Sequence, residues 1–411
     1  MYVRTYPLID PGRTVVDLAT SRRRTALFAL FLTAGLGISS WVTRTPDIRD
    51  LLGASTAEMG LVLLGLSGGS MTGILSSGPL VSRFGARPIV AIGSLAIVLA
   101  MPLIGLGAAL SQSLPVAAGL FVFGLGMGGG EVGMNIEGAD VERVIGRPVL
   151  PALHGCFSLG TVLGAAGGMA LTAVSFPVAW HLALIGAATL PLVLWSVLQL
   201  PTGVGITPAG RHARGPAVWR DRRLALIGLI VLAMALAEGA ANDWLPLMMV
   251  DGHGLDPAAG SGVYVAFAAA MTIGRFTGSF FLDRFGRAAV LCASAIIGGA
   301  GLALVIFVDN AVIAGAAVLL WGLGAALGFP VVLSAAADSG PNPTARVSLV
   351  ATVGYVAFLV GPPALGWLGD HHGLRGAMIV VLAFLTLAAA LAPALRSPAA
   401  APEEREPAIA R

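Results

Sequence analysis

Ser82-Arg83-Phe84-Gly85 is repeated as Asp283-Arg284-Phe285-Gly286, and each copy lies between two long apolar stretches. Other landmarks recur in the same order, at offsets that fall from 203 through 198 to 194: Trp41 and Trp244, Gly124-Leu125-Gly126 and Gly322-Leu323-Gly324, Gly160 and Gly354, Gly167 and Gly361. Chance matches would not keep their order while the offset drifts in one direction, whereas a duplicated half with slightly shorter loops would. The sequence therefore predicts two copies of one membrane-embedded half.

The composition indicates a membrane protein. Hydrophobic residues make up 56% of the chain, charged residues only 11%, and the mean hydropathy is +0.88, whereas soluble domains are roughly a quarter charged. Apolar stretches of about 20 residues suffice to cross a hydrocarbon core about 30 Å thick as helices. We expect an all-α protein with twelve spans, which start near Thr25, Ala57, Pro88, Pro115, Pro151, Val178, Leu224, Ala259, Ala288, Ala311, Arg346 and Arg375.

The repeat and the apolar spans together predict the domain organisation. Two pseudo-symmetric six-helix bundles cover residues 25–200 and 224–397. A central loop over residues 201–223 joins them, and tails cover residues 1–24 and 398–411.

The distribution of arginine predicts the orientation in the membrane, because cytoplasmic loops retain basic residues. All 24 basic residues are arginines, and with both ends inside, most fall in the tails, the central loop and the loops of one side. The opposite side keeps only Arg44, Arg49 and Arg375. We therefore expect both termini in the cytoplasm, and the net charge of +3 reflects topology rather than a nucleic-acid partner. The charged residues around Arg44 and Arg49 are expected to form a solvated mouth after the first span.

The turns between spans resemble those of the major facilitator superfamily. Its loop motif is similar to Gly-x-x-x-Asp-Arg-x-Gly-Arg; the first copy here has Ser82 in the acidic position. The second copy keeps Asp283 and Arg287, with Ser279 in place of the leading glycine. This resemblance covers nearly the whole chain and implies the major facilitator fold.

A more local resemblance is to the bacterial permease branch that contains rhizopine-type carriers and, more distantly, to fucose permeases. The stretches that carry it are Glu131-x-x-x-Asn135-x-Glu137, His154-x-x-Phe157, Glu238-Gly239-x-x-Asn242-Asp243-Trp244 and Gly354-Tyr355. It implies a multi-pass permease of the bacterial cytoplasmic (inner) membrane that moves a small polar solute, a sugar or a related compound, by proton-coupled alternating access. The alternative is a proton-driven exporter of amphipathic compounds, although the fifth span lacks the glycine-proline motif that antiporters of the superfamily tend to carry.

Enzymatic chemistry is not expected. The sequence has no Walker loop, no His-Glu-x-x-His zinc site and no Asp-rich cluster suited to a metal-bound pyrophosphate. We expect no cofactor and no metal, and a monomer whose partners are its solute, the proton and the lipid bilayer.

Two glutamates stand out because an ionisable group at membrane depth seldom persists without a partner, a hydrated cavity or a function. Glu131 and Glu238 lie well inside their spans, and each has an asparagine four residues on, Asn135 and Asn242, on the same helix face. The superfamily resemblance places both pairs on cavity-lining helices. Our hypothesis is that at least one glutamate exchanges protons; the alternative is a permanently paired structural carboxylate.

The repeat singles out the same acids. By the local offsets, Glu131 corresponds to Phe329 and Glu238 to Gly35, so neither has an acidic counterpart. Scaffold features should repeat, whereas solute and proton chemistry need not.

Other candidates lie nearby. Asp243 is interpreted either as an outer gate or hydrated helix end, or as a solute ligand. Trp244 and Trp321 offer rings for stacking against a solute, though tryptophan also anchors helices at the membrane interface; Tyr355 joins this cavity set. Arg275 is a buried charge that needs an acid, either a carboxylate on a neighbouring helix or an anionic solute, because Asp283 lies about two turns away.

The repeated turns are interpreted as gating loops that latch the two halves in the outward-facing state. Because Ser82 carries no charge, the first latch is expected to be weaker or to use Asp140 or Glu142. The gating residues are Arg83, Gly85, Arg87, Asp283, Arg284, Gly286 and Arg287.

Overall fold

The computed structural model describes residues 18–146, 149–206 and 220–396, and every regular element within these residues is a helix. In the described part of the chain, ten segments are long and apolar enough to cross a membrane. Two of them, 51 residues each, are folded at one glycine into a pair of helices, which gives the twelve spans expected from the sequence. Residues 1–17, 207–219 and 397–411 of the expected tails and central loop lie outside the described residues.

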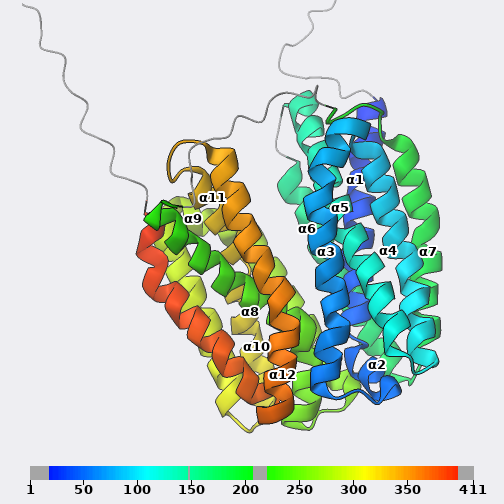
Figure 1. Cartoon of the computed structure of the whole chain (residues 1–411), viewed down its shortest axis with the longest axis vertical. Helices are drawn as coiled ribbons and strands as arrows, with labels where there is room; N and C mark the ends of the chain where they lie inside the picture. Colours follow the sequence, from blue (N-terminus) through cyan, green and yellow to red (C-terminus); the bar gives the residue numbers. More distant parts are fainter. Residues whose placement is uncertain (1–17, 147–148, 207–219, 397–411) are drawn as a thin grey trace, which may run out of the picture. The chain divides into compact units, whose positions relative to one another are not determined.

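The chain divides into two compact units, of which unit 1 comprises Met1–Trp41, Gly65–Gly167 and Phe176–Gly210. The helices that contribute to it run from blue to green in Figure 1: α1 (Leu18–Val42), α3 (Thr56–Phe84), α4 (Ala86–Ala109), α5 (Ser113–Ile145), α6 (Leu150–Ala173) and α7 (Val178–Gln199). Helix α4 packs against α5 and α7. Small residues allow close helix contact: a Cβ atom on Gly69 of α3 would lie 2.0 Å from the carbonyl oxygen of Phe121 on α5.

Unit 2 comprises Val42–Leu64, Gly168–Ser175 and Arg211–Arg411. Its described helices are α2 (Thr45–Leu52) and, from green to red in Figure 1, α8 (Arg222–His253), α9 (Pro257–Phe307), α10 (Ala311–Ala325), α11 (Gly328–Ala337), α12 (Pro343–Leu391) and the 3-10 helix η2 (Ala392–Leu395). Helix α8 packs against α9 and α12, and α9 packs against α10. This packing brings the middle of α8 against α9, where the candidate site lies.

The two Arg-Phe-Gly turns share one backbone conformation. Gly85 has φ 86° and ψ 166°, and Gly286 has φ 75° and ψ 165°. This region of φ and ψ is open essentially to glycine alone. In unit 1 the turn separates α3 from α4, and in unit 2 it folds α9 into two spans. The repeated sequence thus encodes a repeated turn.

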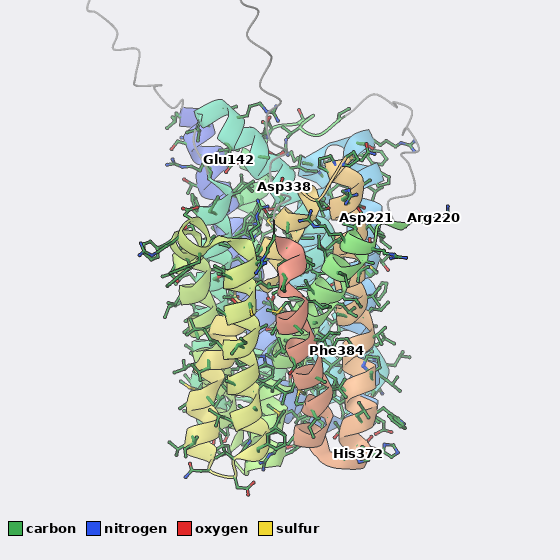
Figure 2. The ribbon with its side chains drawn as sticks, turned by 90° about the vertical axis from the view of Figure 1, so that its left-hand side faces the viewer. Glu142, Arg220, Asp221, Asp338, His372 and Phe384 are labelled. Atoms are coloured by element: carbon green, nitrogen blue, oxygen red, sulfur yellow. The ribbon has the colours of Figure 1, made fainter. Side chains whose placement is uncertain are left out.

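The ends of the helices of unit 2 agree with the expected number of spans. Figure 2 shows Asp221, before α8, and Asp338, after α11, at one end of these helices, with His372 at the other. Asp221 and Asp338 enclose an even number of spans, whereas His372 follows one further span. The number of times the chain passes from one end of these helices to the other therefore agrees with the expected spans.

The start of the first helix differs from the expectation. Helix α1 begins at Leu18 rather than near Thr25, so the arginines at 22–24 are helical. Arg23 is only 8% exposed and pairs with Glu137 and Asp140 of α5. The charge of Arg23 interrupts the apolar sequence pattern before Thr25. The side chain is nevertheless buried, because its acidic partners lie on α5.

One further local expectation was wrong, and one expected span has a local break. The segment after α1 forms the short helix α2, and Arg44 is only 1% exposed, 3.0 Å from the carboxylate of Asp47, rather than solvated. The span that starts at Ala311 is interrupted between α10 and α11. Pro330 has no N–H to donate to the carbonyl of Ala326, which weakens the helix at this break.

Candidate functional site

An ion pair lies in the middle of the spans of unit 2. The Arg275 guanidinium on α9 donates to Oε1 of Glu238 on α8 at 2.9 Å. Their side chains are 27% and 14% exposed, so the pair is only partly open to solvent. A carboxylate on a neighbouring helix, the first of the two alternatives drawn from the sequence, is therefore a partner of Arg275.

A second polar contact follows one helical turn along α8. The hydroxyl of Tyr264 on α9 donates to Oδ1 of Asn242 at 3.0 Å. Tyr264 is 1% exposed and stacks on Phe267, whose ring lies 5.8 Å from that of Trp321 on α10 in an edge-to-face arrangement. Glu238 and Asn242, predicted to share a helix face, thus both bond to α9. Tyr264, one of four tyrosines in the chain, was not singled out from the sequence.

Asp243 lies on the same turn as Asn242 but differs from it in its surroundings. The residue is 9% exposed, and its neighbours Trp244 and Leu245 are wholly buried. Among the described residues, none donates a hydrogen bond to its carboxylate and no cation pairs with it. The interpretation of Asp243 as a hydrated helix end is therefore wrong.

The candidate aromatic residues are packed within the protein. Trp244 and Trp321 are 0% exposed, and neither indole N–H has a hydrogen-bond partner in the described part of the chain. Trp244 is thus buried rather than anchored at a lipid headgroup. Tyr355 on α12 is half-buried, with its ring 5.8 Å from that of Phe329 on α11.

The repeat shows that the ion pair is specific to the second half. By the local offsets, Glu238 corresponds to Gly35 and Arg275 to Ile74. A Cβ atom on Gly35 would lie 2.0 Å from the carbonyl oxygen of Phe157, so α1 touches the backbone of α6 at this position. At this position the first half has a glycine that allows close helix packing, whereas the second half has the charged Glu238.

The candidates of unit 1 lie on α5. Glu131 is exposed, and Asn135 is half-buried with its Oδ1 3.1 Å from Nε2 of His154 on α6. His154 also lies edge-on to Phe31 of α1, with ring centroids 5.1 Å apart. The Asn135 side chain therefore links α5 to α6, a contact that only the fold reveals.

A buried acid missed in the sequence lies further along α5. Glu137 is 0% exposed, and its Oε2 accepts from Arg23 Nε at 2.9 Å and from Nη2 at 2.5 Å. The Nη1 atom of Arg23 is 2.8 Å from Asp140, which also pairs with Arg143 at 3.1 Å. The signal available in the sequence was an arginine run just before an apolar span, but its partners lie more than 100 residues away.

The gating residues make mainly local contacts within their own units. The guanidinium of Arg83 lies 5.1 Å from the ring of Phe84, and that of Arg284 lies 5.7 Å from the ring of Phe285. Arg287 pairs with Asp338 at 2.6 Å, whereas Asp283 is exposed and forms no ion pair with a described residue.

The acids proposed to replace Ser82 are also engaged within unit 1. Asp140 binds arginines, as above, and Glu142 accepts from the backbone N–H groups of Val149 and Leu150 at 2.6 and 2.8 Å. Glu142 therefore caps the start of α6.

A cavity of about 400 Å³ lies far from the ion pair. Its polar lining comes from Thr56, Asp251, His372 and Arg375. Asp251 follows Glu238 by 13 residues along α8, which corresponds to about 20 Å. The cavity belongs to the helix ends of unit 2 and not to the candidate site.

Within the described residues, these features define a multi-pass membrane protein with a duplicated half and an ion pair inside its apolar region. The chain belongs to the major facilitator superfamily, whose family model matches residues 152–353. Members of this superfamily are transporters, not enzymes.

The relatives cover most of the chain. An uncharacterized MFS-type transporter of Yersinia pestis is 30% identical over 87% of this chain and 92% of its own length. An uncharacterized transporter of Sinorhizobium fredii is 31% identical, with 89% and 96% covered. Membrane protein MosC of Rhizobium meliloti is 26% identical, with 87% and 86% covered. The resemblance to this bacterial permease branch is confirmed.

Solved structures share the fold. A point mutant of the nucleoside transporter NupG superposes with a TM-score of 0.74 at 15% identity, covering 91% of this chain and 98% of NupG. A variant of the Escherichia coli fucose:proton symporter FucP gives 0.64 at 16%, with the same coverage. At these identities the likeness shows the fold alone.

Proposed function

We propose that this chain is a secondary active transporter that moves a small polar solute, a sugar or a related compound, across the bacterial cytoplasmic membrane. It works by alternating access, is driven by the proton gradient, and has both termini in the cytoplasm. Superfamily membership supports transport, and the arginine distribution supports the orientation.

The observation that supports a polar solute is the arrangement of side chains on α8 and α9. Glu238 and Arg275 form a partly open pair, and Asn242 with Tyr264 adds amide and hydroxyl groups one turn away. Carboxylate, guanidinium, amide and phenol groups offer both donors and acceptors, as binding a polyhydroxylated solute requires. NupG is a nucleoside transporter and FucP is a fucose:proton symporter, which agrees with this class of solute.

The charge balance at the site favours a polar solute over a lipophilic cation. Arg275 neutralises Glu238, so the pair presents no net charge. An exporter of amphipathic cations needs an acid that is free to attract them. Of the two glutamates considered for proton exchange, Glu131 and Glu238, the second is held by Arg275.

The test uses the full-length protein in liposomes. Thermal stabilisation is screened with L-fucose, D-glucose, uridine and ethidium, and uptake of each compound is then measured with and without an inward proton gradient. We expect stabilisation and gradient-driven uptake with a sugar or nucleoside, abolished by a protonophore. Stabilisation and proton-driven extrusion of ethidium, without any response to the polar compounds, would establish the exporter instead.

A further inference from the structure

Asp243 is an acid that the fold does not require. By the offset that relates Trp41 to Trp244, its counterpart in the first half is Ser40 of α1. Ser40 is 0% exposed, and its hydroxyl donates to the carbonyl oxygen of Leu36 at 2.7 Å. A serine at this position thus donates its hydroxyl hydrogen within its own helix. An ionised carboxylate cannot, because it only accepts hydrogen bonds and the N–H groups within a helix are already used.

Among the described residues of unit 2, the elements that pack against α8 supply no compensating charge to Asp243. Helices α10 and α11 and η2, which pack against α8, carry no ionisable residue. From α9, Tyr264 and Arg275 face this region; the hydroxyl of Tyr264 bonds to Asn242, and Arg275 pairs with Glu238.

The remaining charged groups around α8 are paired or lie at helix ends. On and beside α2, Arg44 pairs with Asp47, and Arg49 pairs with Asp50 and Asp251. On α12, Tyr355 contacts Phe329. The charged or titratable groups of α12 lie at its start and at the turn around Gly373: Arg346 pairs with Asp221, Arg375 pairs with Asp309, and Asp370, His371 and His372 precede Gly373. No cation among the described residues is left for Asp243.

A buried carboxylate without a donor or a cation costs several kcal/mol in its charged form and is accommodated as the neutral acid. Glu238 differs, because Arg275 holds its charge in place. Glu131 is exposed. Of the three candidate acids, Asp243 is therefore the one whose charge depends on whether water reaches it.

We propose that Asp243 is the residue that takes up and releases the coupled proton, an inference that rests on the transport function proposed above. The carboxyl group holds the proton while α8 is packed as seen here, and releases it when a conformational change hydrates this turn. Glu238 and Arg275 then serve the solute, so that proton and solute occupy adjacent turns of one helix.

The first test detects the proton directly and needs no solute. Infrared spectra of the protein in liposomes are recorded at neutral pH for wild type, Asp243→Asn, Asp243→Ser and the exposed control Asp370→Asn. We expect the carbonyl band of a buried protonated carboxyl group in wild type and Asp370→Asn, and its loss in both Asp243 variants. Asp243→Ser copies Ser40 and guards against misfolding of the asparagine variant. A band that persists in folded Asp243→Ser overturns the proposal.

The second test separates this inference from the proposed function. Uptake of L-fucose, D-glucose and uridine is measured with and without an inward proton gradient. We expect the gradient to raise uptake by wild type and by Asp370→Asn, and this rise to be lost in Asp243→Asn. An equal rise in Asp243→Asn overturns the inference and leaves the proposed function intact. A wild type without any gradient-driven uptake overturns both.

Discussion

Glu238 and Arg275 meet at 2.9 Å across α8 and α9, although neither residue has a charged counterpart in the other half of the duplicated chain. The pair is therefore present in only one of the two copies of a shared scaffold. Each side chain restricts the other, since a lone charge in this region would be costly. The pair thus combines a structural restraint with charged groups that a solute can reach.

Removing both members of this pair should cost less than the sum of removing each one alone. We expect Glu238→Gln and Arg275→Gln each to destabilise the protein by about 1–3 kcal/mol, less than the 3–5 kcal/mol typical of fully buried pairs because both groups are partly exposed. The double variant should lose less than the sum of the single losses. Thermal melting of the four proteins in detergent measures the coupling. Additive losses would mean that the two charges do not interact.

Arg23 should matter more than its neighbour Arg22. Arg23 is 8% exposed and binds Glu137, which is wholly buried, whereas Arg22 is exposed. Arg23→Ala leaves the Glu137 carboxylate without its cation, and we expect a loss of about 3–5 kcal/mol. Arg22→Ala is the matched control and should stay within about 0.5 kcal/mol of wild type. Similar melting temperatures for the two variants would contradict the packed ion pair.

The overall fold could be predicted from the sequence because its determinants are local. Span length, apolar content and a glycine with positive φ, such as Gly85 or Gly286, are each encoded within a short stretch. The partner of Arg23 is 114 residues away, and finding it requires the rotation of α5 about its axis. The same holds for Arg275: its need for an acid could be predicted, whereas the choice of Glu238 depended on how α8 and α9 face each other.

Burial of Asp243 could not be predicted for a related reason. Counting residues placed it towards the end of a span, but α8 runs on to His253 and is packed against several helices there. Burial of a side chain at this depth depends on which helices pack against α8, which the sequence of α8 alone does not give.

The Asp221–Arg346 pair predicts a dependence of stability on pH. The hydrogen bond from Arg346 holds the pKa of Asp221 below its usual value, helped by the N–H groups of Leu224 and Arg223. A lowered folded-state pKa means that this stabilisation is complete above the unfolded pKa of about 3.9 and is lost as the pH falls through the folded value. Asp221→Asn should therefore melt lower than wild type at pH 7, with a difference that shrinks in acid.

Asp256 provides the control for this measurement. It caps α9 through the N–H groups of Ala258 and Ala259, as Asp221 caps α8, but has no arginine partner among the described residues. Asp256→Asn should cost only the loss of a cap charge, a few tenths to about 1 kcal/mol. Equal losses in the two variants at pH 7 would show that the arginine contributes nothing beyond the cap.

The unequal turns predict opposite effects of two substitutions on the resting conformation. Asp283 is exposed, and its counterpart Ser82 only donates to the carbonyl oxygen of Pro79 at 2.8 Å. If Asp283 latches the halves in the outward-facing state, Asp283→Asn should shift the population towards inward-facing, and Ser82→Asp should shift it back by adding a second acid. A shift of about 1.4 kcal/mol changes the ratio of the two states tenfold. Labelling of single cysteines introduced at the ends of the helices measures this ratio. Unchanged labelling in Asp283→Asn would contradict a gating role for Asp283. The two repeated turns would then share only the backbone conformation of their glycines.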